Sequence, residues 1–340
     1  MFQPRPAPPP PEEPALFSAR DLDDHRPALI AHAYRMTASA SDADDAVQDA
    51  MVRAWRARER FRGESSLRTW LLRIVTRTSL DLLAKRQPRL RPTDLGWPGT
   101  THDELEVRGR SAWVEPIADA EVLDPSLSPE EALASRRHLR LAFVAALQRL
   151  PARQRAVLLL ADGCGWRAPE IADTLGMTPA AVNSALQRAR ATLGGAGGDG
   201  SDGSAGFAPD PLEPAQARLL DAYLAAFEAY DVDALLAVLR EDVTLCMPPY
   251  ALWLRGHADV RAWLLGRGIG CRGSRLLRVA ANGTCAFGQY RPGGSGGAYL
   301  PWSLILLETD GGKITSIIHF LDAPALFPRM GLPERLPPLG

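Results

Sequence analysis

The apolar residues between positions 41 and 86 recur at three- and four-residue steps and predict two α-helices, separated by a short break at Phe61–Gly63. We place the start of the first helix at Ser41, because Asp44 follows at the spacing of an N-terminal capping box. A further helix is predicted at Leu22–Ala38. Together the three helices predict one compact helical module.

The polar faces of the two later helices differ in charge. Asp45, Gln48 and Asp49 lie outward on the first helix. The outward stripe of the second helix is Thr69, Arg73, Thr76 and Arg77. Between positions 53 and 91 the sequence has twelve basic residues and three acidic ones. An acidic and amide face beside a cationic one predicts two different partners.

A second helical region follows at 130–193, and its end has the pattern of a helix-turn-helix. Within WRAPEIADTLGMTPAAVNSALQRARATL, a short helix ends before a turn at Gly176. A new helix then starts with Thr178 as its cap and Pro179 at its first position. Its outward residues are Ala180, Ala181, Asn183, Ser184, Gln187, Arg188 and Arg190. Such polar side chains can reach base edges while arginines hold phosphates, although this geometry also occurs without DNA binding.

Residues 214–333 change from helical to strand periodicity along the chain. Helices are predicted at 215–229, 233–239 and 257–265, with a short strand VTLCM between the last two. Four strands follow, separated by turn residues such as Asn282–Gly283, at 275–281, 284–290, 299–308 and 313–321. Helices followed by successive antiparallel hairpins predict an α+β cone.

The local composition of the chain indicates where one module ends and the next begins. The chain is long enough for two or three domains, and its net charge of −1 hides the segregation of charge along it. Between positions 94 and 129, eight acidic residues oppose two basic ones. The divisions we predict are a disordered proline-rich tail (1–20), a helical module (21–92), an acidic linker (93–129), a helix-turn-helix module (130–194), a glycine-rich tether (195–213) and the cone (214–333).

Two classes of protein are disfavoured by the sequence. No apolar run reaches eighteen residues, so no membrane span is expected. The four cysteines lie far apart without metal-ligand spacing, which favours free thiols in a reducing cytoplasm.

Several stretches resemble bacterial extracytoplasmic-function (ECF) sigma factors, the promoter-recognition subunits of RNA polymerase. DADDAVQDAMVRAW resembles their polymerase-docking helix, and FRGESSLRTWLLRIVTRTSLDLL resembles the segment that opens and reads the minus-ten element. LPARQRAVLLL and EIADTLGMTPAAVNSALQRAR resemble their minus-thirty-five module. WLRGHADVRAWLL and ITSIIHFLD resemble the SnoaL-like members of the NTF2-like superfamily, which a subset of ECF sigma factors carries at the C-terminus.

The resemblance implies an alternative sigma factor in the cytoplasm, with core RNA polymerase (through its beta-prime clamp and beta flap) and promoter DNA as partners. Core polymerase would be bound by Asp45, Gln48 and Asp49. The minus-ten element would meet Phe61, Arg68, Thr69, Arg73, Thr76 and Arg77, with the break at 61–66 as a loop for an unstacked base. The minus-thirty-five element would be held by Thr178, Ala181, Asn183, Ser184, Gln187, Arg188 and Arg190. The cone would regulate the two modules in cis.

The acidic linker has two interpretations. It is either a solvated spacer or, as the resemblance implies, a segment that runs through the RNA path of the polymerase and competes for its cationic walls.

The cone raises the question of catalysis, because relatives of this fold include isomerases, cyclases and hydrolases. Such chemistry needs a histidine or carboxylate in an apolar cavity, and the candidates are His319, Asp322, His257 and Asp259. No paired-carboxylate or His–Asp spacing stands out, so we expect no enzyme, cofactor or metal site. The residues that would either line a ligand pocket or fill a core are Trp253, Phe287, Tyr290, Trp302 and His319.

Two functional alternatives stay open. A conventional helix-turn-helix regulator would bind promoter DNA without polymerase. A bifunctional protein would bind or convert a small molecule in its cone.

Overall fold

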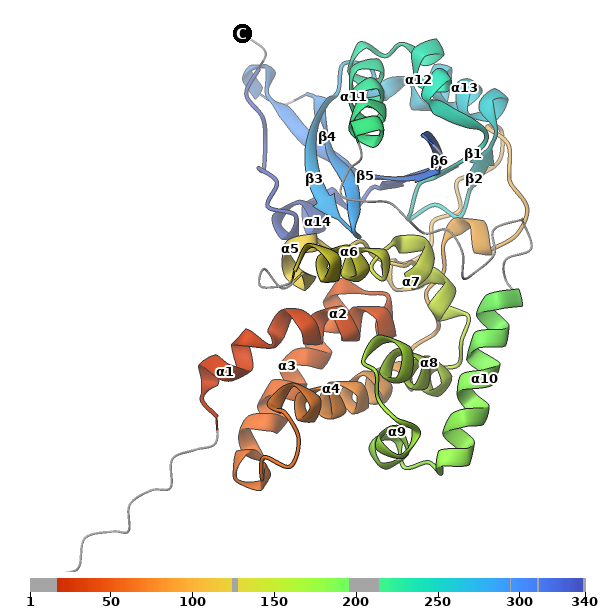
Figure 1. The fold of residues 1–340 in the computed structure, drawn as a ribbon. Coiled ribbons are helices and arrows are strands. Elements are labelled where there is room, and N and C mark those ends of the chain that lie inside the picture. Colours follow the sequence, from red (N-terminus) through yellow and green to blue (C-terminus); the bar gives the residue numbers. More distant parts are fainter. Residues whose placement is uncertain (1–16, 124–127, 196–213, 294, 311, 339–340) are drawn as a thin grey trace, which may run out of the picture.

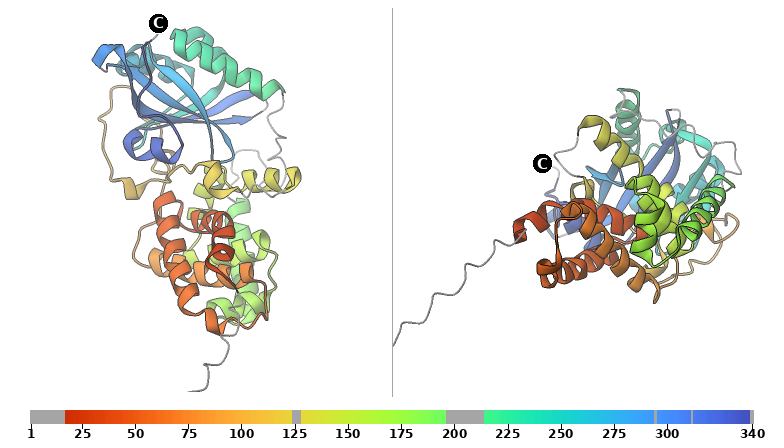
Figure 2. Two further views of the ribbon diagram at one scale, coloured as in Figure 1. Left: turned by 90° about the vertical axis from the view of Figure 1, so that its left-hand side faces the viewer. Right: turned by 60° about the horizontal axis from the view of Figure 1, so that its bottom comes forward.

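The computed structural model describes residues 17–123, 128–195, 214–293, 295–310 and 312–338. Most of the proline-rich tail and nearly all of the glycine-rich tether lie outside these ranges. A helical part and a sheet-containing part are stacked, with helices α5 to α7 between them (Figure 1). The left view of Figure 2 shows the same order of layers.

The first helical module packs four helices: α1 (Ala19–Asp24), α2 (Arg26–Thr37), α3 (Ala40–Arg56) and α4 (Leu67–Leu83). Their apolar stripes meet as the periodicity predicts. The predicted start of α3 is wrong by two residues, because the N-cap is Ser39 and not Ser41. The Ser39 hydroxyl accepts the backbone N–H of Asp42 at 3.1 Å.

The acidic linker is not an irregular spacer in this structure. It contains two 3₁₀ turns, Pro92–Asp94 and Arg110–Ala112, and helix α5 (Asp119–Val122). Its apolar residues Trp113, Val114 and Ile117 are buried, which explains why the segment is fixed. The backbone also pairs with the cone: Arg108 N–H donates to Pro249 O at 3.0 Å, and Ala251 N–H donates to Glu106 O at 2.9 Å.

The second helical module consists of α6 (Pro129–Arg137), α7 (Leu141–Gln148), α8 (Ala152–Leu158), a π turn at Leu159–Gly163, α9 (Ala168–Leu175) and α10 (Pro179–Gly195). The predicted turn at Gly176 is present, and its φ of 62° is a left-handed conformation that glycine adopts without strain. Thr178 caps α10 by accepting the N–H of Ala181 at 3.2 Å.

The cone contains α11 (Pro214–Ala229), α12 (Val232–Val238), α13 (His257–Leu265), α14 (Ala323–Arg329) and a six-stranded sheet. The strands are β1 (Leu239–Cys246), β2 (Trp253–Arg255), β3 (Arg275–Ala281), β4 (Thr284–Pro292), β5 (Tyr299–Asp310) and β6 (Lys313–Phe320). Their order is β2-β1-β6-β5-β4-β3, with β1 parallel to β6 and the other pairs antiparallel. The predicted α+β class is confirmed.

The two faces of this sheet have different neighbours. Ile305 and Ile317 belong to the apolar cluster beneath α11, α12 and α13. Leu306 and Ile318 point the other way and share one continuous core with Leu29 of α2. The outer face of the cone is therefore buried against the helical part of the chain.

Candidate functional site

The acidic face of α3 is accessible along most of its length. Asp45, Gln48 and Asp49 are exposed, as the sequence predicts. Asp49 pairs with Arg53 at 2.8 Å. Near the start of the helix, Asp44 is instead held by Arg329 of α14 at 2.8 Å. The cone thus reaches the edge of this face without covering it.

The arginine face of α4 is directed at the second helical module. Arg77 Nε donates to Thr174 O at the end of α9, at 2.9 Å. The Arg73 guanidinium lies 5.8 Å from the centre of the Trp166 ring. Arg68, near the start of α4, is exposed. Two of the arginines predicted to meet DNA therefore contact the protein itself.

Thr76 does not belong to this outward face, so its prediction is wrong. It is fully buried, and its hydroxyl donates to Leu72 O at 2.6 Å. The same oxygen lies 3.0 Å from His32 Nε2. Since the hydroxyl proton is used on Leu72, His32 must donate through Nε2. A buried partner on α2 explains why a polar residue faces inward here.

This buried histidine predicts a loss of stability in acid. Desolvation lowers the pKa of His32 to about 3, whereas its ordinary value is 6.5. Between these values the unfolded chain binds a proton that the folded chain does not, so stability falls as pH decreases below 6.5, by up to about 1.4 kcal/mol per pH unit. Urea unfolding from pH 7 to 4 should show a shallower loss in His32→Gln. His102→Gln, at an exposed site, should behave as the parent; equal slopes for all three would contradict the assignment.

Phe61 is also not available to an unstacked base in this structure. Its ring packs against Trp70 at a centroid distance of 5.2 Å and against Phe17 at 5.6 Å. Phe17 comes from the segment predicted to be a disordered tail, and it is buried. The aromatic side chain of Phe17 holds the end of this segment against Phe61 and Trp70.

The outer face of α10 has the predicted composition. Thr178, Asn183, Ser184, Gln187, Arg188 and Arg190 are exposed, and Ala181 is half-buried. Arg190 is neutralised by Asp162 of the π turn, at 2.6 Å. The described contacts of the other polar residues leave this helix face free for a partner.

The residues predicted to line a pocket in the cone do not surround one cavity. Phe287 is buried in the cluster under the helices, whereas Trp253 and Tyr290 belong to the core on the opposite face. Trp302 is 40% exposed and stacks with Arg291 at 4.1 Å. His319 lies on the helix side, 6.4 Å from Phe227 between ring centres. These residues therefore do not line one cavity, and Trp253, Phe287 and Tyr290 fill cores, which is the alternative that the sequence left open.

A chain of polar side chains runs from His319 into the cone. Its Nδ1 lies 3.2 Å from Ser303 Oγ, which donates to Gln289 Oε1 at 2.7 Å. Gln289 in turn donates to Ser274 Oγ at 3.0 Å. Desolvation lowers the pKa of His319 to about 4, so the imidazole is neutral at pH 7. Within the described ranges, no cluster of three or more metal-ligating side chains occurs.

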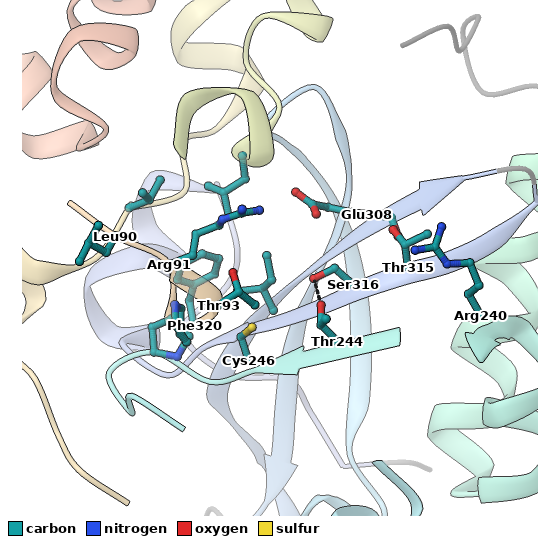
Figure 3. A pocket seen from close by; sticks show the side chains of 15 residues that line it. Leu90, Arg91, Thr93, Arg240, Thr244, Cys246, Glu308, Thr315, Ser316 and Phe320 are labelled. Atoms are coloured by element: carbon teal, nitrogen blue, oxygen red, sulfur yellow. Dashed lines mark hydrogen bonds between the residues drawn. The ribbon is translucent and has the colours of Figure 1, made fainter. Parts of the chain in front are cut away.

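A cavity of about 280 Å³ lies on the other face of the sheet, at the junction with the helical part (Figure 3). Its charged lining residues are Arg91, Arg240 and Glu308. The sequence analysis missed these residues, since each is an isolated charge in its own segment. All four cysteines are free thiols, and Cys246 lies in the wall of this cavity.

Comparison with known families follows the same division of the chain. Residues 22–89 match the Sigma-70 region 2 family, residues 140–193 match Sigma-70 region 4, and residues 220–317 match the SnoaL-like domain family. These matches define a protein with both DNA-reading regions of a sigma factor and an appended SnoaL-like domain. None of the helices in the described ranges has the length and hydrophobicity needed to cross a bilayer.

Whole-chain relatives make the family more specific. The ECF RNA polymerase sigma factor SigG of Mycobacterium tuberculosis is 41% identical over 329 residues, which cover 94% of this chain and 85% of SigG. SigJ of the same species is 28% identical over 320 residues, covering 91% of this chain and 93% of SigJ. The crystal structure of SigJ matches with a TM-score of 0.55 at 24% identity, over 92% of this chain and 98% of SigJ.

The chain belongs to the ECF sigma factors of RNA polymerase, and the predicted family is confirmed. Its function is that of an alternative sigma factor, with core RNA polymerase and promoter DNA as its partners. From here on, the first helical module is called region 2, the helix-turn-helix module region 4, and the α+β domain the cone.

Proposed function

We propose that this structure is a closed, resting form of the sigma factor, in which the cone holds regions 2 and 4 together. The observation that carries the proposal is the position of Arg73 and Arg77, whose side chains meet Trp166 and Thr174 of region 4. Each guanidinium keeps free N–H donors, but region 4 packs against the face of α4 along which a promoter strand would have to lie. Promoter opening therefore requires region 4 to leave the arginine face of α4.

The cone supplies the contacts that favour the closed form. Asn282, in the β3–β4 turn, accepts the N–H of Ile117 in the linker and donates to Tyr34 of α2. It also donates to Leu139 O at the entrance to α7. One residue of the cone thus joins region 2, the linker and region 4. Arg329 adds a contact to Asp44 of α3.

Opening would give each predicted surface its partner. Core polymerase would dock on Asp45, Gln48 and Asp49, whose exposure in the closed form allows first contact. The minus-ten element would then meet the side chains of Arg68, Thr69, Arg73 and Arg77. Region 4 would present Thr178, Ala181, Asn183, Ser184, Gln187, Arg188 and Arg190 to the minus-thirty-five element. The linker, once released from the cone, could enter the RNA path of the polymerase.

Hydrogen exchange on the full chain tests this opening. In the closed form, the N–H of Arg108 is bonded to Pro249 O, and the N–H of Gly99 is bonded to Trp253 O. We expect both segments to lose protection when core polymerase binds, because the linker must leave the cone. Interior amides of the cone sheet, such as that of Leu306, serve as the internal control and should stay protected. Unchanged protection of the linker in the polymerase complex would refute the proposal.

We also propose that the cone regulates and does not catalyse. His319 has Ser303 Oγ as its hydrogen-bonding neighbour, and the described contacts bring no carboxylate to it. A neutral imidazole with a pKa of about 4 is a weak base at pH 7. We further propose that the protein is cytoplasmic, because a sigma factor acts where core polymerase and DNA are found.

A further inference from the structure

The cavity in Figure 3 is built from three parts of the chain that are far apart in sequence. Leu90 to Thr93, just after region 2, form one wall, and Leu141 at the start of α7 in region 4 forms another. Strands β1, β5 and β6 of the cone supply the floor. Its volume of about 280 Å³ suits a small metabolite and is at the lower end of ligand sites in proteins.

Arg91 contributes a guanidinium to this cavity, and not all of its N–H donors are bonded. Its Nε contacts Asp94 at 3.5 Å, while neither terminal nitrogen has a recorded hydrogen-bond partner among the described residues. Desolvation alone would lower the pKa of Arg91, but the carboxylates of Glu308 and Asp94 outweigh it and raise that pKa. The guanidinium therefore stays charged and keeps donors available for a ligand.

Glu308 brings the opposite charge from the cone. One carboxylate oxygen accepts the N–H of Ala142 in the first turn of α7, at 3.1 Å, and the other has no recorded partner among the described residues. Figure 3 shows the Arg91 guanidinium and the Glu308 carboxylate directed toward each other across the cavity. They are nevertheless not close enough to form an ion pair. Both charged groups therefore line the cavity without neutralising each other in a direct ion pair.

The rest of the lining fits a small amphipathic molecule. Thr244 Oγ1 donates to Ser316 Oγ at 2.9 Å on the strand floor. Thr93 Oγ1 is buried without a hydrogen-bond partner among the described residues, so it has capacity for one more. Ile318 and Phe320 provide apolar surface beside these hydroxyls.

We propose that this junction cavity binds a free α-amino acid with an apolar side chain. The ligand carboxylate pairs with the terminal nitrogens of Arg91, and its ammonium group pairs with the open oxygen of Glu308. The side chain packs on Ile318 and Phe320. A ligand with a single charge leaves unused either the terminal nitrogens of Arg91 or the second oxygen of Glu308, so it binds more weakly than an amino acid.

The position of the cavity implies that ligand binding favours the closed form over the open form. This step rests on the proposed function. The segment that follows region 2, region 4 and the cone line the cavity together only in the closed form. A ligand that binds only this form stabilises it by mass action. At a concentration about a hundred times its Kd, it should lower the open population by about a hundredfold.

Calorimetry on the full chain tests the site without polymerase. The probes are L-leucine, L-valine, L-methionine and L-phenylalanine, and the controls are 4-methylpentanoate and 3-methylbutylamine, each of which lacks one charge of leucine. We expect saturable binding of at least one amino acid, and binding of each control at least about tenfold weaker. No binding of any of the four at about 10 mM, or equal binding of a singly charged control, would overturn the proposal.

Variants locate the binding in the cavity. Arg91→Gln and Glu308→Gln should each weaken it by at least about tenfold. Arg218→Gln and Glu241→Gln make the same changes at exposed positions of the cone and should bind as the parent. Thr244→Val keeps both charges and removes only a hydroxyl from the cavity floor. A several-fold loss of binding with an unchanged circular dichroism spectrum would place the ligand on this floor. Full binding by both charge variants would exclude the site.

In vitro transcription separates the two proposals. If an amino acid binds through Arg91 and Glu308 and also lowers transcription, both the ligand site and its stabilisation of the closed form are supported. If it binds in this way without any effect on transcription, the site stands and the closed-form proposal fails. If nothing binds while linker amides still lose protection on polymerase, the site fails and the closed form stands.

Discussion

Replacing Asn282 by alanine should increase promoter binding and transcription by the full-length protein. In the closed form, Asn282 is fully buried and bonds to Ile117 N–H at 3.0 Å, Tyr34 Oη at 2.6 Å and Leu139 O at 2.9 Å. Truncation leaves the side-chain bonds to Ile117 N–H and Leu139 O unmade in the closed form, while Tyr34 Oη keeps its bond to Glu115 O. Water satisfies the freed groups once the parts separate. The cost therefore falls on the closed form alone. A cost of about 1–3 kcal/mol shifts the equilibrium toward the open form by about five- to 150-fold.

The measurement is transcription from one matched promoter with core polymerase, alongside promoter binding at several salt concentrations. Glu241→Ala, at an exposed position of the same domain, is the control and should act as the parent. Gly283→Ala provides a second route, since its new Cβ would lie 2.2 Å from Arg136 O at the same junction. It should open the protein in the same direction. A fall in transcription in both variants, with the cone still folded by circular dichroism, would reverse the sign of the proposed regulation.

The helices and hairpins of this protein could be predicted because their signals are local. Strand β3 and helix α13 have the bounds that the sequence predicts. The Asn282–Gly283 turn was also predicted, and both residues adopt the left-handed conformation. Nothing local, however, indicates that the Asn282 side chain would join three other segments. That role depends on partners brought together only by the tertiary fold.

The errors on α4 have the same cause. Periodicity places Thr76 on the polar stripe with Arg73 and Arg77, and the spacing is correct. It cannot show that His32 on α2 offers Thr76 a buried hydrogen bond. Phe61 was assigned to an open loop, because its cover, Phe17, lies in a segment dominated by proline.

The junction cavity lay beyond sequence reasoning for a stronger reason. Arg91 follows a proline-rich break and Glu308 ends a predicted strand, so each has the pattern of a solvated surface charge. The parallel pairing of β1 with β6, which brings Thr244 beside Ser316, is a long-range contact without a turn signal between the strands. The residues of this cavity come from three separate parts of the chain, so they form no motif of fixed spacing that could be recognised in the sequence.

Replacing Arg155 by alanine should cause the largest loss of stability in the chain. The side chain is 3% exposed, and its guanidinium donates to Met36 O near the end of α2 and to Leu147 O near the end of α7. It also donates to Leu150 O at 3.0 Å. One cation thus caps the C-terminal ends of a region 2 helix and a region 4 helix, where partial negative charge favours it. Burial lowers the pKa of Arg155 to about 10, so it remains charged at neutral pH.

Alanine at this position leaves several buried carbonyls without a donor, and we expect a loss of about 3–5 kcal/mol in the free energy of unfolding. Arg155→Lys keeps the charge but has no planar fork to span the separate carbonyls, so it should recover only part of the loss. Arg153→Ala removes the same side chain two positions away, where it is exposed, and should change stability little. Urea unfolding of the three variants makes the comparison. Equal stability of Arg155→Ala and Arg153→Ala would mean that the two helix ends do not depend on this guanidinium.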